Sequence, residues 1–181
     1  TEAAAGAGIV FPKFEAGENE LWLDDVKLTD EQPSPTADLL TDDGGSVPDF
    51  LSLFGTAASI ARLPSGLAGK PCWQIRYSLG QREIAGLFRG VGTGALAGSA
   101  GLHVSLQVSA HTLLAVQVKE RDGSEYTTVL DLPPGRIEDR ELPWPDFRQG
   151  DNSTDENGRL DVDQIREVNV LDATNAFGGG G

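Results

Sequence analysis

The chain is poor in the residues from which most compact active sites are built. Its 181 residues include one cysteine, two histidines and no methionine. A single cysteine excludes an intrachain disulfide and a cysteine metal cluster, so we expect Cys72 to be a small packed residue. His103 and His111 lie in no recognisable nucleophile motif, and neither a Gly-x-Ser-x-Gly elbow nor a Walker motif is present. We therefore expect no hydrolytic triad, no zinc site and no catalytic residues.

Basic residues and long apolar runs are also scarce. Lysine and arginine total 14 against 28 acidic residues, which gives a net charge of −14. Such a charge repels nucleic acid and anionic lipid surfaces, so we expect neither as a partner. No stretch approaches the roughly 18 to 20 apolar residues that span a bilayer. The missing methionine indicates that Thr1 results from processing, truncation or an incomplete start, and removal of a signal peptide would make the protein extracytoplasmic, periplasmic or secreted.

Turn-forming residues are abundant by contrast, and they separate short segments of alternating polarity. The chain has 23 glycines and 10 prolines, which favours many short strands over long helices. Cys72–Leu79 and Leu102–Ser109 alternate apolar and polar residues, the pattern of an antiparallel sheet with one wet face. Asp49–Phe54 fits a short helix or a strand. Further strands are expected at 84–91, 113–118, 126–132 and 167–171, with a hairpin turn at 121–124. The sequence thus predicts an all-β sandwich.

The N-terminal part differs in character from the rest. Residues 1–37 are predicted to form an arm with one strand at 21–28 and a proline-containing linker after it. The β-sandwich body would then span 38–181 as a single domain. An apolar stretch in the arm would either anchor it on a partner or cover the domain's own sheet; its residues are Ile9, Val10, Phe11 and Phe14.

Three short motifs suggest relatives. Two of them resemble features that two families share. Leu142–Phe147 resembles the proline–aromatic corner of these families, and Leu160–Val168 resembles the step before their penultimate strand. The two families are the family 11 jelly-roll carbohydrate-binding modules and the complex I intermediate-associated protein 30 family, whose domain is galactose-binding-like. Glu20–Leu28 resembles their closing strand, although it stands here at the start of the chain. The resemblance implies a jelly roll whose N-terminal strand completes its own sheet or that of a neighbouring copy. We favour the first, because a missing strand would expose two sheet edges.

The two resemblances imply two functions. As a carbohydrate-binding module, the domain would bind a polysaccharide through polar side chains on its wet sheet faces. Trp73 and Tyr77 are expected to face inward, so few aromatic groups remain to stack on sugars. The alternative is an accessory or assembly subunit that docks on a larger protein complex, such as an electron-transfer complex. The candidate carbohydrate-binding residues are Gln74, Arg76, Arg89, His103, Gln107 and Gln117.

The acidic residues suit Ca²⁺, which prefers six to eight oxygen ligands. The jelly-roll resemblance implies a structural calcium that joins the first and last strands, and the candidate ligands are Asp24, Asp25, Asp42 and Asp43. The alternative is that these carboxylates only face water. A glycosidase pair among Glu120, Glu125, Asp131 and Glu138 is disfavoured, because coincidental pairs are common among so many acids.

One glycine-rich segment fits a loose dinucleotide-binding pattern. Gly92–Ala97 has the Gly-x-Gly-x-x-Ala form. That fingerprint needs a helix after it, and the residues that follow predict a further loop and a strand. We therefore expect no nucleotide.

Overall fold

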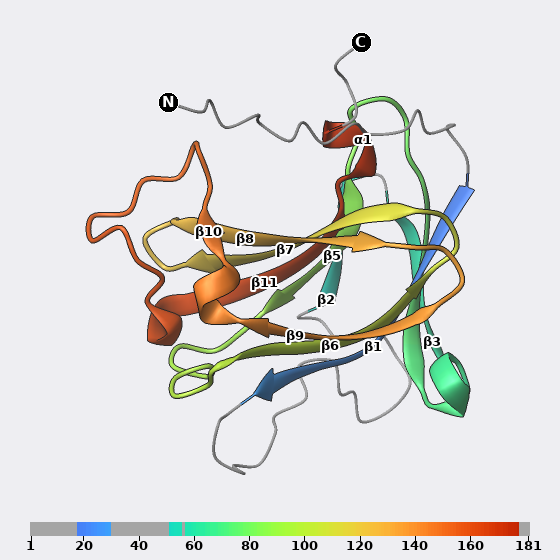
Figure 1. Cartoon of the computed structure of the whole chain (residues 1–181), viewed down its shortest axis with the longest axis horizontal. Coiled ribbons are helices and arrows are strands. Elements are labelled where there is room, and N and C mark those ends of the chain that lie inside the picture. The colour runs from blue at the N-terminus through green and yellow to red at the C-terminus, as the bar shows by residue number, and fades with distance from the viewer. Residues whose placement is uncertain (1–17, 30–50, 56, 178–181) are drawn as a thin grey trace, which may run out of the picture.

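The strands form two antiparallel sheets packed face to face as a β-sandwich (Figure 1). The computed structural model describes residues 18–29, 51–55 and 57–177. Sheet A has the strand order β3-β4-β1-β6-β9, and sheet B has the order β10-β8-β7-β11-β5-β2. This arrangement is the predicted all-β jelly-roll sandwich.

Sheet A consists of β1 (Glu18–Thr29), β3 (Ala57–Leu63), β4 (Cys72–Ser78), β6 (Gly101–Val108) and β9 (Ile137–Pro143). Sheet B consists of β2 (Leu51–Gly55), β5 (Ala85–Gly90), β7 (Thr112–Glu120), β8 (Glu125–Leu132), β10 (Arg148–Gln149) and β11 (Ile165–Asp172). The helical turns of the described part are η1 (Leu67–Gly69), η2 (Trp144–Asp146), η3 (Val162–Gln164) and α1 (Thr174–Phe177). Within these residues, no helix has the length and apolar character that a membrane crossing needs.

The strands expected from alternating polarity are confirmed, and the described part of Asp49–Phe54 is a strand rather than a helix. Three strands, β3, β9 and the two-residue β10, were not predicted. Edge strand β9 lacks a clean alternation because Glu138 occupies a core-facing register position opposite Leu106. Glu138 is buried and pairs with Arg140 at 2.6 Å. An inward-facing charge on an edge strand discourages further strand pairing, which explains why β9 does not look like a strand in sequence.

Strand β1 lies inside sheet A, between β4 and β6. Leu21 and Leu23 are fully buried, so the strand contributes to this domain's own core. The N-terminal strand therefore completes the sheet of its own domain, as favoured from sequence. The pairing with β6 shifts between Leu23 and Val26, a bulge that allows the strand to contain Asp24 and Asp25. The expected linker follows the predicted strand and ends at residue 37; its residues 30–37 lie outside the described residues, so it stays a prediction.

The 142–147 corner closes one end of the core. Trp144 and Phe147 are both buried, and their ring centroids lie 5.4 Å apart. The indole Nε1 of Trp144 donates a hydrogen bond to the Ser99 carbonyl at 2.8 Å. Trp144 is therefore a packing residue with its polar atom satisfied. Cys72 is likewise buried, in agreement with its predicted packing role.

A buried carboxylate links the two sheets. Asp172 of β11 is 1% exposed, and Tyr77 of β4 donates its hydroxyl to Asp172 Oδ2 at 2.9 Å. The Thr174 backbone N and Oγ1 both donate to Asp172 Oδ1. Burial raises the pKa of Tyr77, and the adjacent Asp172 charge and hydrogen bond raise it further, so the hydroxyl stays a donor. Three donors thus compensate Asp172 for its loss of water.

Tyr77→Phe is expected to lower the free energy of unfolding by about 1–3 kcal/mol, because it removes one donor from a buried carboxylate. Urea denaturation measures the change, with Ser78→Ala, at the exposed neighbouring position, as the control. Equal stability of Tyr77→Phe and wild type would mean that this hydrogen bond does not hold the sheets together.

Candidate functional site

The six candidate carbohydrate-binding residues do not lie on one surface. Gln74 and Arg76 on β4, with His103 and Gln107 on β6, belong to sheet A. Arg89 on β5 and Gln117 on β7 belong to sheet B. Because the two sheets pack against each other through their inner faces, the outer faces point in opposite directions. The six residues therefore cannot contribute to a single site.

On the outer face of sheet A, much of the polar capacity is used within the domain. Gln107 Nε2 donates to the Gly135 carbonyl at 2.8 Å, and Gln74 is only 8% exposed. The Ser105 hydroxyl donates to Asp139 on β9. His103 Nε2 lies 4.0 Å from Asp139 Oδ1. These contacts mainly join neighbouring strands and loops.

Arg89 corrects a prediction, because its register position is on the core side of sheet B. It pairs with Val168 and lies two residues from Leu87, and both of these side chains are buried. Residues two apart in a strand share a face, so Arg89 does not belong to the wet face on which it was expected. Burial lowers the pKa of its guanidinium. The sequence did not reveal which face Arg89 occupies, because its neighbours Leu87 and Phe88 are both apolar although they lie on opposite faces of the strand.

Gln117 lies on the outer face of sheet B within a network of polar side chains. Asn169 Nδ2 donates to Gln117 Oε1 and to Glu167 Oε1, each at 3.0 Å. Gln117 Nε2 donates to Glu125 Oε2 at 3.3 Å, and Lys119 Nζ donates to Glu125 Oε1 at 2.7 Å. We call these five residues from three adjacent strands the amide network.

An apolar strip runs beside the amide network on the same outer face. Leu171 and Ala115 are register partners and, with Ala173 and the partly buried Ile84, form a hydrophobic cluster separate from the main core. Gly86 pairs with Leu171, and a Cβ there would lie 2.0 Å from the Val170 carbonyl oxygen. Leu171, Ala115 and Ala173 are themselves buried, so the accessible apolar groups on this face are the half-buried Ile84 and Phe88. The face places them next to hydrogen-bonding groups, the combination that small-molecule sites use.

Asn169 was missed by sequence reasoning. It stands in Val168–Asn169–Val170, and a polar residue between two buried valines was the available signal. Only the pairing of β11 with β7 places Asn169 next to Gln117.

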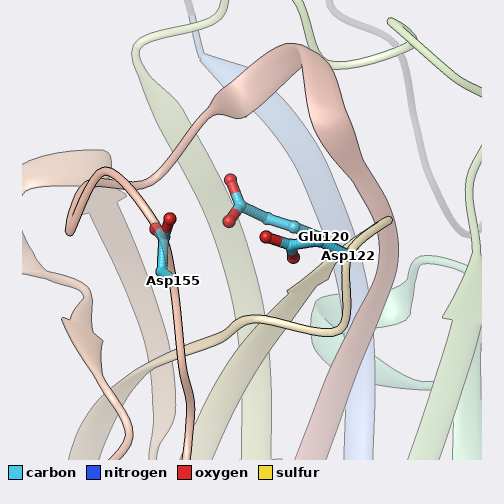
Figure 2. A group of neighbouring side chains, drawn as sticks. All are labelled: Glu120, Asp122 and Asp155. Atoms are coloured by element: carbon cyan, nitrogen blue, oxygen red, sulfur yellow. The ribbon is translucent and has the colours of Figure 1, made fainter.

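A second group of polar residues lies at one end of sheet B (Figure 2). Glu120 ends β7, Asp122 lies in the turn to β8, and Asp155 comes from the loop after β10. One carboxylate oxygen from each of the three residues lies within 4.8 Å of the other two. Ser124 N donates to Asp122 Oδ1 at 2.8 Å and closes the turn. The Tyr126 hydroxyl donates to Asp155 and holds the loop. We call Glu120, Asp122 and Asp155 the acidic trio.

The trio is electrostatically uneven. The pKa of Glu120 is raised to about 7, mainly by burial and also by the charges of Asp155, Asp122 and Asp161. A hydrogen bond from the Asp161 backbone N acts in the opposite direction and lowers this pKa. Hydrogen bonds from Ser124 lower the pKa of Asp122, and the Tyr126 hydroxyl lowers that of Asp155. Three converging carboxylates, one of them deeply buried, can hold a metal ion.

The predicted calcium ligands are different residues. Asp42 and Asp43 lie outside the described residues, and for Asp24 and Asp25 the description covers only the backbone. The apolar docking residues Ile9, Val10, Phe11 and Phe14 also lie outside it. Among the described residues, Gly92–Ala97 forms turns followed by β6, without the helix of a dinucleotide site. The trio was not predicted as a metal site, because its members come from a strand end, a turn and a separate loop.

The fold is that of the family 11 carbohydrate-binding modules. No protein-family model and no curated protein matches the chain. Among solved structures, the chain is similar to the family 11 module of a cellulosomal cellulase of Clostridium thermocellum, with TM-score 0.57, 19% identity and coverage of 75% of this chain and 84% of that one. A family 11 module from the same organism, in complex with a β-1,3-1,4-mixed-linked tetrasaccharide, matches with TM-score 0.54, 17% identity and coverage of 84% and 89%.

A third similar structure is an exo-β-agarase, with TM-score 0.50, 16% identity and coverage of 71% of this chain and 22% of that one. The jelly-roll resemblance proposed from the sequence motifs is thereby confirmed. These comparisons give no support to the complex I intermediate-associated family or to the accessory-subunit alternative.

Glu120→Gln is expected to change how stability depends on pH. Folded Glu120 keeps its proton up to about pH 7, whereas an unfolded glutamate releases it near pH 4.3. The folded state binds more protons in this interval, so the wild type loses stability as pH rises through it. Between pH 5 and pH 8, we expect the wild type to lose about 1–3 kcal/mol relative to Glu120→Gln in metal-free buffer.

Denaturant titrations at several pH values test this, with Glu156→Gln as the control, because Glu156 is an exposed carboxylate next to Asp155 in the loop after β10. Parallel pH curves for the wild type and Glu120→Gln would rule out a raised pKa at this residue.

Proposed function

We propose that this domain is a non-catalytic carbohydrate-binding module that binds a neutral polysaccharide on the outer face of sheet B. The observation that carries the proposal is the amide network beside the apolar strip on one face of a jelly-roll sandwich. Sugar rings offer apolar C–H faces and hydroxyl-bearing edges, and the half-buried Ile84 and Phe88 together with the amide network complement them.

The dimensions of the face favour an oligosaccharide over a single sugar. A row of register partners crosses the outer face from β5 to β10: Phe88, Asn169, Gln117, Thr127 and Arg148. Neighbouring strands lie about 4.8 Å apart, so this row extends over roughly 19 Å. Half-buried Phe88 supplies an aromatic group at one end. The net charge of −14 disfavours acidic polysaccharides, which leaves neutral ones.

Gln117→Ala and Gln107→Ala form a matched pair that tests the location of the site. Both glutamines are half-buried on outer faces, but of opposite sheets. We expect Gln117→Ala to weaken binding at least tenfold and Gln107→Ala to leave it unchanged, as measured by affinity electrophoresis in gels that contain mixed-linkage β-1,3-1,4-glucan or agarose. The reverse result would move the site to sheet A. A wild type that none of a panel of neutral polysaccharides retards would contradict the function itself.

We further propose that the ion held by the acidic trio is Ca²⁺. Carboxylate oxygens from a strand end, a turn and a loop suit a cation that accepts irregular oxygen geometry. Binding would neutralise the mutual repulsion of the three carboxylates. An ion at this position would attach the loop after β10 to the β7–β8 turn. A calcium site also agrees with the extracytoplasmic location that we expect for a polysaccharide-binding protein.

Millimolar CaCl₂ at pH 8 is expected to raise the Tm of the wild type by several degrees and to leave Glu120→Gln unchanged, because only a folded-state site is stabilised by mass action. MgCl₂ at the same concentration controls for ionic strength. Equal shifts for both proteins, or for both salts, would argue against a calcium site at the trio.

A further inference from the structure

One member of the amide network is incompletely satisfied. Asn169 is 5% exposed, and its Nδ2 donates to both Gln117 Oε1 and Glu167 Oε1. In the described part of the chain, its buried Oδ1 has no hydrogen-bond partner. Native proteins rarely leave a buried side-chain acceptor unpaired, because the loss of hydration costs about 1–3 kcal/mol.

The orientation of this amide is determined by its neighbours. If the amide turned over, Oδ1 would face the oxygen acceptors of Gln117 and Glu167, and both hydrogen bonds would be lost. The unpaired oxygen is thus the consequence of two donations, one to Gln117 on the neighbouring strand β7 and one to Glu167 on the same strand. An apolar residue of similar size would avoid the unpaired atom, so the stability of the fold alone does not explain asparagine at this position.

The two donations restrain long side chains that otherwise rotate freely. Gln117 and Glu167 are half-buried on the outer face, and Gln117 in turn donates to Glu125. A free glutamine or glutamate loses up to about 1.5–2 kcal/mol of rotamer entropy when it is immobilised. Where the protein has already restrained such side chains, a ligand does not have to, and its affinity is higher.

We propose that Asn169 is a positioning residue that holds Gln117 and Glu167 in the geometry that binds sugar hydroxyls. This inference rests on the proposed carbohydrate-binding function and adds a role for a residue that the sugar need not touch. The unsatisfied Oδ1 is the structural cost of that role, and functional sites are where such local costs are expected.

Asn169→Leu separates this role from a structural one. We expect a fall in affinity of about tenfold for mixed-linkage glucan, together with an unchanged or higher Tm, because the partners of Asn169 can turn toward water. A parallel loss of affinity and Tm would make Asn169 an ordinary structural residue. Asn169→Asp keeps the shape but removes both donations, and it should lose affinity as Asn169→Leu does.

A mutant cycle with the Gln117→Ala/Glu167→Ala variant distinguishes positioning from direct contact. If Asn169 acts through these two side chains, adding Asn169→Leu to that variant weakens binding no further. If the two losses multiply, Asn169 acts independently and the inference is overturned.

A ligand-free measurement keeps the inference separate from the function. The side-chain amide of Gln117, observed by NMR, should become more mobile in Asn169→Leu, while that of Gln107 on the opposite sheet should not change. An unchanged Gln117 amide overturns the positioning role even where the wild type binds glucan. A mobile Gln117 amide in a protein whose wild type binds no polysaccharide would support the positioning contacts and reject only the proposed function.

Discussion

Backbone pairing of β1 with both β4 and β6 makes sheet A continuous, and the rest of the sandwich depends on that continuity. Without β1, the facing edges of β4 and β6 would be unpaired, and the core would lose the two fully buried leucines Leu21 and Leu23. Sheet B packs on this surface through one hydrophobic cluster that includes residues of both sheets. The strands that carry the candidate site on the outer face of sheet B are anchored through this packed inner face.

Polar groups are treated differently in the two environments of this fold. Between the sheets, Asp172 receives hydrogen bonds from Tyr77 and Thr174, so a buried charge is fully compensated. On the outer face of sheet B, Asn169 is also buried, yet one of its polar atoms lacks a partner among the described residues. The hydrogen bonds of Asp172 compensate for its loss of hydration, whereas the unpaired oxygen of Asn169 lowers the stability of the folded state. What favours the amide network over the polar residues of sheet A is its position beside apolar side chains on one face, since His103 of sheet A also has an unpaired buried atom, Nδ1, among the described residues.

The acidic trio illustrates a further constraint, the surplus of negative charge. Glu120 is buried with Asp122 and Asp155 close by, an arrangement that raises the pKa of Glu120 and that could also hold a metal ion. The strand end, the turn and the loop after β10 meet at this position. Negative charge, which the sequence analysis assigned to calcium at the N-terminal aspartates, is thus also concentrated at the end of sheet B that carries the β7–β8 turn.

The sequence by itself determined the fold class, most strands and the turn at 121–124, because alternating polarity and turn residues are local properties. Its short motifs also indicated the family 11 type of jelly roll. Tertiary structure alone decided which sheet each strand joins and therefore which polar residues are neighbours. Arg89 and Gln117 looked alike in sequence, but strand pairing placed them on opposite faces of sheet B. Asn169 and the acidic trio became visible only through contacts between distant segments. Alternation shows that a strand has two unlike faces, whereas long-range pairing decides what each face meets.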